Sequence, residues 1–243
     1  MRLMILDSIQ SHEIRNHFKK NRRSETRGRN RPPPEAPHSK LKHCVRQEIL
    51  IATRNKGKVR EIYEALRGLR VRILSLSDFP GAPAVEEDGK SFTENALKKA
   101  RFYSQRSARI TIADDSGLVV EALKGSPGIF SARYAGPGAS DRTNNQKLLK
   151  EMEGLGVSRR KARFQCSLAI VAPGGKETVV EGSCRGVIGF KEVGKKGFGY
   201  DPLFVLPRYG RTMAQFTVEE KNKISHRGKA LRKLRKVIGQ FLR

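Results

Sequence analysis

The order of apolar and polar residues along the chain changes near Glu48, and from there strand and helix patterns alternate. A short apolar run with β-branched residues at 48–53 predicts a strand. Four apolar residues then follow at the spacing of a helix with one buried face: Val59, Ile62, Leu66 and Leu69. Strand character returns at 71–76, and this strand, helix, strand order predicts two parallel strands.

The middle of the chain repeats this alternation. Ser91 and Glu94 have the spacing of a capping box, which predicts the start of a helix whose buried side carries Ala96, Ala100 and Tyr103. The segment 109–115 predicts a strand that ends in two adjacent carboxylates. A loop rich in glycine and proline, 125–138, separates this strand from a further helix that begins near Asp141.

The last third of the chain predicts a hairpin, because the strand patterns at 164–172 and 177–183 are separated by a Pro-Gly-Gly turn. Another short strand is predicted at 202–206. The chain then ends in a basic amphipathic helix with the apolar residues Leu231, Leu234, Ile238, Phe241 and Leu242. Parallel units combined with a hairpin predict an α/β (mixed α+β) domain around a mixed β-sheet.

Composition divides the chain into two parts. The 243 residues contain 50 Lys and Arg against 24 Asp and Glu, a net charge of +26. Residues 1–47 are polar, basic and contain three consecutive prolines, so they are predicted to be a disordered leader before a folded domain at 48–243. A targeting peptide and a wrongly assigned start codon are the alternatives for this leader.

Composition also excludes several classes of protein. No apolar run is long enough to span a membrane. The three cysteines, Cys44, Cys166 and Cys184, are odd in number and form no CxxC pair, which disfavours a disulfide scaffold or a structural zinc site and favours the reducing cytoplasm. The excess of positive charge suggests a polyanionic partner, either a nucleic acid or a phosphorylated small molecule.

The first candidate site is TRNKGK, Thr53 to Lys58, between a predicted strand and a predicted helix. Backbone N–H groups at the start of a helix favour a bound phosphate, and Thr53, Asn55 and Lys58 add donors and a cation. The spacing is not that of a Walker A loop. An ordinary turn before a helix is the alternative interpretation.

The second candidate site is acidic. Although the domain is basic, five carboxylates occur in two short clusters, at 86–88 and at 114–115. Adjacent carboxylates repel each other unless a cation lies between them, and oxygen ligands of this type suit Mg²⁺. A carboxylate there could also deprotonate an attacking water. Solvated turns are the alternative.

Two further segments carry candidate binding residues. In GFGYDP, at 197–202, Phe198 offers a flat face to a base and Asp201 can accept hydrogen bonds, although both aromatic residues of this loop could instead pack in the core. His226, within SHRG just before the last helix, is the only histidine of 48–243. With Arg227 it could donate to a base, or it could be structural.

Taken together, the motifs TRNKGK, EEDG, ENALKKA, ADDSGL, PGIFSARYAG, GFGYDP and EEKNKISHRG resemble, in order, those of the inosine/xanthosine triphosphate pyrophosphatase family. Members of this family, which includes dITP/XTP pyrophosphatases, remove non-standard purine nucleotides from the nucleotide pool. The resemblance implies a two-lobed α/β domain with the active site in the cleft between the lobes, a Mg²⁺ cofactor and a homodimer.

The same resemblance implies residue roles. Glu87 and Asp115 would bind Mg²⁺, and Asp115 would also accept a proton from the attacking water, with Asp114 supporting the metal. The substrate-binding residues would be Thr53, Arg54, Asn55, Lys56, Gly57, Lys58, Lys99, Ser116, Phe198, Gly199, Tyr200, Asp201, Lys221, His226 and Arg227. The implied reaction is hydrolysis of ITP, dITP or XTP to the nucleoside monophosphate and pyrophosphate.

Two other functions remain open from the residues. A related pyrophosphatase of modified pyrimidine triphosphates would use the same phosphate loop and carboxylates. A nucleic-acid-binding protein is suggested by the net charge, the basic leader, RRKAR at 159–163 and KALRKLRK at 229–236. The grouped carboxylates argue against nucleic acid as the main partner, and only weak, non-specific binding through the leader is expected.

Overall fold

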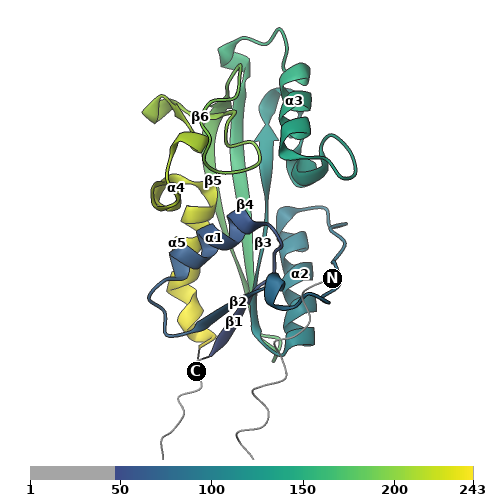
Figure 1. Ribbon diagram of the computed structural model, residues 1–243, viewed down its shortest axis with the longest axis vertical. Coiled ribbons are helices and arrows are strands. Elements are labelled where there is room, and N and C mark those ends of the chain that lie inside the picture. The colour runs from purple at the N-terminus through teal and green to yellow at the C-terminus, as the bar shows by residue number, and fades with distance from the viewer. Residues whose placement is uncertain (1–46, 243) are drawn as a thin grey trace, which may run out of the picture. The chain divides into compact units, whose positions relative to one another are not determined.

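The computed structural model describes residues 47–242, and the predicted leader lies outside them except for its last residue. A seven-stranded mixed sheet, in the order β2-β1-β3-β4-β5-β6-β7, forms the centre of this part (Figure 1). The strands are β1 Glu48–Ile51, β2 Arg72–Ser75, β3 Ile110–Val120, β4 Lys161–Val171, β5 Glu177–Ile188, β6 Phe204–Leu206 and β7 Arg211–Thr212. The helices are α1 Lys56–Leu66, α2 Phe92–Ser107, α3 Asp141–Glu151, α4 Val218–Ile224 and α5 His226–Val237.

The sheet is mixed in the way that the residue pattern predicts. β1 pairs in parallel with both β2 and β3, while β4 and β5 form a long antiparallel hairpin beside β3. The elements at 48–53, 71–76 and 164–183 are therefore confirmed, with boundaries shifted by a few residues. Helix α4 and the two-residue strand β7 were not predicted.

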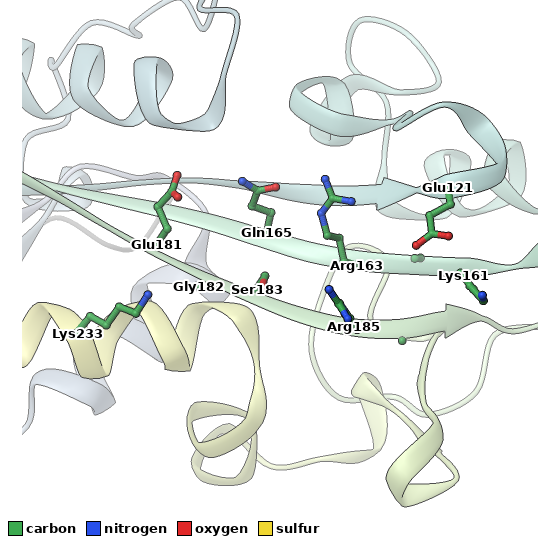
Figure 2. A pocket seen from close by; sticks show the side chains of 11 residues that line it. Glu121, Lys161, Arg163, Gln165, Glu181, Gly182, Ser183, Arg185 and Lys233 are labelled. Carbon is green, nitrogen blue, oxygen red and sulfur yellow. The ribbon is translucent and has the colours of Figure 1, made fainter.

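Side chains on β4 and β5 alternate between the two faces of the sheet. On one face, Arg163 lies opposite Arg185 and Gln165 lies opposite Ser183. Figure 2 shows these side chains along the two strands, together with Glu181. The intervening residues, such as Phe164, are buried in the core on the other face.

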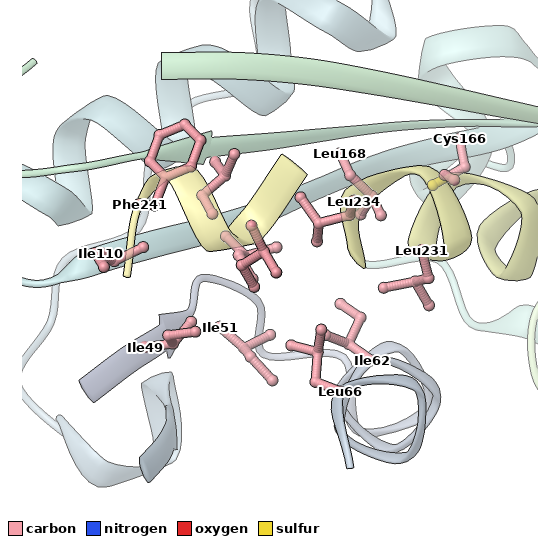
Figure 3. Close-up of a cluster of buried hydrophobic side chains, with 14 residues drawn as sticks. Ile49, Ile51, Ile62, Leu66, Ile110, Cys166, Leu168, Leu231, Leu234 and Phe241 are labelled. Carbon is pink, nitrogen blue, oxygen red and sulfur yellow. The ribbon is translucent and has the colours of Figure 1, made fainter. Parts of the chain in front are cut away.

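The buried apolar residues form three clusters that divide the domain into two lobes. In the first lobe, Ile49 and Ile51 pack with α1 and α5 on one face of the sheet (Figure 3), while Leu50 and Ala52 pack with α2 on the other. The second lobe contains the far halves of β3 to β5, with α3 and the segment 200–216. The long strands run through both lobes, which confirms the predicted two-lobed mixed α/β fold.

The C-terminal helix is shorter than predicted. α5 ends at Val237, and a turn of 3₁₀-helix, Ile238–Gln240, follows it. Phe241 nevertheless packs in the same apolar cluster as Leu231 and Leu234. The apolar pattern therefore identified the buried residues correctly, although it did not show where the helix ends.

Candidate active site

Asp114 and Asp115 lie in the middle of β3, between the apolar residues of the two lobes. The predicted strand end at Asp115 is wrong, because the strand continues to Val120 and pairs with β4 from Thr111 to Val120. The next residues, Gly117 to Val120, continue the antiparallel pairing of β3 with β4. Since successive side chains of a strand point to opposite faces, the two aspartates face opposite sides of the sheet.

Asp114 belongs to a group of six charged residues that we call the Asp114 network: Lys58, Glu61, Asp114, Asp201, Lys221 and Arg227. The carboxylate of Asp114 pairs with Lys58 Nζ at 2.6 Å and with Arg227 Nε at 2.8 Å. Glu61 connects this pair to the next one, since its two oxygens lie 2.5 Å from Lys221 Nζ and 2.5 Å from Arg227 Nη1.

The Asp114 network is completed by Asp201, whose Oδ2 lies 2.7 Å from Lys221 Nζ. Three carboxylates thus meet three cations, and all except Lys58 are buried. Burial alone would raise the pKa of Asp114, but Arg227 and Lys58 outweigh it and hold the pKa well below its ordinary value. The pKa of Glu61 is likewise lowered, because Arg227 and Lys221 outweigh the effect of burial.

Asp115 belongs to a second group, the Asp115 cluster, made of Glu87, Lys99 and Asp115. Lys99 of α2 lies between the carboxylates, with Nζ 2.5 Å from Glu87 and 3.1 Å from Asp115 Oδ1. Arg133 is farther away, 3.8 Å from Glu87. The second oxygen of Asp115, Oδ2, is buried and has no hydrogen-bond partner. The two carboxylates therefore share a single close cation.

The pKa of Asp115 differs in direction from that of its neighbour. Burial raises the pKa of Asp115, and Lys99 and Lys58 offset this only in part, so the pKa stays above its ordinary value. For Lys99, burial acts to lower the pKa, but Asp115 and Glu87 outweigh burial and raise it. Lys99 therefore carries its charge at neutral pH, and an ionised Asp115 lacks full compensation.

The loop 53–58 forms the start of α1, as predicted. Asn55 caps the helix by accepting a hydrogen bond from the Lys58 N–H at 3.0 Å, and Thr53 Oγ1 accepts one from the Asn55 N–H at 3.2 Å. Two other residues of the loop take no part in the Asp114 network: Arg54 donates to the carbonyl of Ala82, and Lys56 is exposed. Only Lys58 of this loop joins the Asp114 network.

The loop that contains Phe198 lies against the start of α1. A Cβ atom added to Gly57 would lie 2.2 Å from the Phe198 ring, so only glycine permits this approach. The ring also lies 5.0 Å from Lys221 Nζ and 5.5 Å from the guanidinium carbon of Arg227, measured to its centroid. Segments far apart in the sequence thus meet around Phe198.

The other residues of this loop are held within the protein. Asp201 Oδ2 accepts a hydrogen bond from the Phe198 N–H at 3.0 Å, and Tyr200 is buried and donates to the carbonyl of Ser131 at 2.9 Å. Gly199 donates to Asp141 of α3. Tyr200 therefore packs in the core, which is the alternative that the sequence analysis gave to a binding role for this loop.

Ser116 and His226 both border the Asp114 network. The Ser116 hydroxyl donates to Asp114 Oδ1 at 2.8 Å and accepts a hydrogen bond from Arg227 at 2.8 Å. His226 is buried and stacks on Phe164, with ring centroids 4.7 Å apart. Burial first, and then the charge of Arg227, hold its pKa well below the ordinary value, so the ring is neutral. Its Nδ1 has no partner.

Sequence reasoning missed one member of the Asp114 network, Glu61, and one neighbour of the Asp115 cluster, Arg133. Glu61 is a polar residue inside an amphipathic helix, and its partners, Lys221 and Arg227, lie about 160 residues further along the chain. Arg133, which donates to the Glu87 carbonyl at 2.9 Å, lies in the segment PGIFSARYAG. That segment was recognised as a motif, but nothing in its pattern indicated a contact with Glu87.

Comparison with known proteins identifies the family. The model of the Ham1 family matches residues 49–237. A dITP/XTP pyrophosphatase from Geobacter sulfurreducens is 52% identical over 191 residues, covering 79% of this chain and 96% of that protein. One from Geobacillus kaustophilus is 53% identical over 188 residues, covering 77% and 92%. The structure of a HAM1 protein from Coxiella burnetii matches with a TM-score of 0.72 at 40% identity, covering 80% of this chain and 99% of that one.

The chain therefore belongs to the Ham1 family. The resemblance predicted from seven motifs is confirmed, and so is the mixed α/β fold that it implied.

Proposed function

We propose that this protein is a Mg²⁺-dependent pyrophosphatase of ITP, dITP and XTP, which releases the nucleoside monophosphate and pyrophosphate. The family and the names of its relatives support a hydrolase of nucleoside triphosphates. The observation that carries the proposal is the Asp115 cluster, where a buried carboxylate oxygen has no partner and two carboxylates share one close cation. With two carboxylates and one close cation, the site can accept a further positive charge.

The residues present fit Mg²⁺. Among residues 47–242, no group of three or more Asp, Glu, His or Cys side chains is placed to hold a metal ion. Mg²⁺, however, commonly binds through one or two carboxylates, with water and substrate phosphates as the other ligands. Glu87 and Asp115 supply two such oxygen ligands. When bound, Mg²⁺ would neutralise charge on the phosphates and polarise them.

Within the reaction, Asp115 acts as the general base. Its carboxylate takes a proton from the attacking water as the water oxygen forms a bond to the α-phosphorus and the bond to the leaving pyrophosphate breaks. Lys99 holds Asp115 in place and would stabilise charge on the phosphates. Lys58, Asn55 and Thr53, at the start of α1, receive the triphosphate with the positive end of the helix dipole.

The base is recognised by the residues beside the start of α1, around the Asp114 network. Phe198 would stack on the purine, while Lys221 and Arg227, which lie 5.0 Å and 5.5 Å from its ring, and the neutral His226, whose Nδ1 has no partner, would supply polar groups to the base. Donors directed at the O6 atom of hypoxanthine or xanthine would face the amino group of adenine, and each such mismatch costs about 1–3 kcal/mol. This arrangement favours ITP and XTP over ATP.

The product of the reaction tests the proposal. Purified protein is incubated with ITP, XTP, dITP, ATP, GTP and dUTP, with Mg²⁺ or with a chelator, and pyrophosphate and orthophosphate are measured separately. We expect pyrophosphate from ITP, dITP and XTP only when Mg²⁺ is present. Orthophosphate as the first product would contradict the reaction, and a preference for dUTP would assign the protein to pyrimidine nucleotides.

The oligomeric state and the location stay predictions. A homodimer is expected, and sedimentation equilibrium measures it directly. A cytoplasmic location is expected from the odd number of cysteines and the lack of a CxxC pair, and within residues 47–242 Cys166 and Cys184 are free and buried. Within residues 47–242, no helix is both long and apolar enough to cross a membrane.

A further inference from the structure

The face of the sheet that carries Arg163 and Arg185 forms an open groove of about 830 Å³ (Figure 2). Four cations line it: Lys161, Arg163, Arg185 and Lys233. The first three come from β4 and β5, and the last comes from α5, which packs along β5. None of them belongs to the Asp114 network or the Asp115 cluster.

These cations have no counterions in the part of the chain that the structure describes. Arg163 and Arg185 lie directly opposite each other on antiparallel strands, an arrangement of like charges that is destabilising by itself. Figure 2 shows Glu181 and Glu121 toward opposite ends of the groove, with the arginines between them. Glu181 is engaged by hydroxyls, accepting from Thr93 at 2.8 Å and from Ser167 at 3.0 Å.

A second pocket of about 580 Å³ adjoins the groove and shares Ser183 and Arg185 with it. It adds three more cations, Arg208, Lys223 and Lys229, none of which forms an ion pair within residues 47–242. It also contains Tyr209, a residue with 42% of its surface exposed. We call the cations of the two pockets, with Tyr209, the basic band.

We propose that the basic band binds single-stranded nucleic acid, in addition to the nucleotide hydrolysis at the active site. The band combines two basic segments that sequence analysis singled out, 159–163 and 229–236, which the fold brings together across β5. Although Lys229 donates to the Ser183 carbonyl at 2.8 Å, none of the seven cations forms an ion pair within residues 47–242, and cations spread over adjoining pockets match an extended chain of phosphates better than a compact anion. The exposed ring of Tyr209 offers a stacking surface for a base.

The surface charge also distinguishes this partner from a second copy of the chain. An isologous contact would place the same seven cations of each copy near those of the other, with only Glu121 and Glu181 to oppose them. A single strand of RNA or DNA meets no such repulsion. The proposal does not depend on the nucleotide specificity of the active site.

Binding is measured with the full-length protein and fluorescent 20-nucleotide strands of RNA and DNA, by anisotropy at several salt concentrations. A duplex of the same length serves as a third probe. We expect binding of the single strands that weakens linearly with the logarithm of salt concentration. Weaker binding of one of the two single strands identifies whether RNA or DNA is preferred.

The variant R163E/R185E tests the location. We expect at least about a tenfold loss of affinity, and a salt slope smaller by about 1.4, since each phosphate contact contributes about 0.7 for single strands. The matched control is R70E/K150E, which changes the net charge equally at two exposed residues outside the band. Its affinity should fall less than about threefold. Tyr209→Ala should reduce affinity about fivefold without changing the slope.

Hydrolysis of ITP by R163E/R185E should equal that of the unmodified protein, which shows that the variant is folded. Three results would overturn the proposal: no binding of any strand by the full-length protein, equal losses in R163E/R185E and R70E/K150E, or an unchanged salt slope. Conversion of a dimer to a monomer by R163E/R185E would likewise overturn it, and would assign the band to contacts between copies.

Discussion

Asp114 and Asp115 are adjacent in the chain, yet they lie in opposite electrostatic environments. In the Asp114 network three carboxylates meet three cations, and the pKa of Asp114 is held well below its ordinary value. In the Asp115 cluster two carboxylates share Lys99 as their close cation, and the pKa of Asp115 is raised. One aspartate is balanced, while the other has an unpartnered oxygen.

The difference indicates that Asp114 contributes mainly to stability and Asp115 mainly to reactivity. A balanced buried pair holds elements together, because breaking it leaves an uncompensated charge in the core. An unbalanced carboxylate has an oxygen available for a metal or a proton. The two aspartates therefore share a sequence motif while contributing to different properties of the protein, and substitutions at these two positions should show this.

Replacing Asp115 with asparagine should have the largest effect. Asparagine cannot accept the proton or hold the metal in the same way, so we expect turnover of ITP to fall by at least about 10³-fold. The free energy of unfolding should change by only about 1 kcal/mol or less, because the raised pKa means that the ionised form is disfavoured in the folded state. Steady-state kinetics and urea unfolding of the same preparation measure both. Turnover near that of the unmodified protein would rule out Asp115 as the base.

Asp114→Asn is the matched substitution one position away. It removes the carboxylate that pairs with Lys58 and with the buried Arg227, which then keeps only Glu61, and we expect a loss of about 3–5 kcal/mol in the free energy of unfolding. Urea unfolding at low temperature keeps the variant measurable. If Asp114→Asn and Asp115→Asn lower stability equally, the contrast between the two environments is wrong.

The contrast was only partly accessible from the sequence. The polar run DDSG, which follows a strand pattern, predicts a strand that ends in two adjacent carboxylates. The apolar residues after Ser116 continue the strand, and the period of two then places the aspartates on opposite faces. The sequence therefore singled out the two aspartates as candidates, but their separation onto opposite faces follows only from the pairing of β3 with β4.

Glu61 shows a different reason why sequence reasoning stops short. The helix pattern correctly identified Ile62 and Leu66 as buried, and the same pattern assigns a glutamate to the solvent side. Its burial becomes favourable only because Lys221 and Arg227 meet it there. Partners so distant in sequence leave no local pattern. The fold was predictable from local patterns, whereas the charge pairing within the Asp114 network was not.

Acid titration should show the same contrast with the smallest effect. Because the folded-state pKa values of Glu61 and Asp114 are lowered, their contribution to stability is complete above about pH 4.5 and is lost as pH falls through the folded values. Each proton taken up on unfolding adds about 1.4 kcal/mol per pH unit to the slope. Asp114→Asn should therefore flatten the acid limb of stability against pH by up to this amount.

Asp115→Asn is the control, and it should not flatten the acid limb. Because the folded-state pKa of Asp115 is raised, the folded protein takes up this proton more readily than the unfolded chain, and protonation of Asp115 favours folding. Urea unfolding between pH 3 and 6 for both variants compares the two slopes, and parallel acid limbs would show that the Asp114 network does not hold its carboxylate in the charged form.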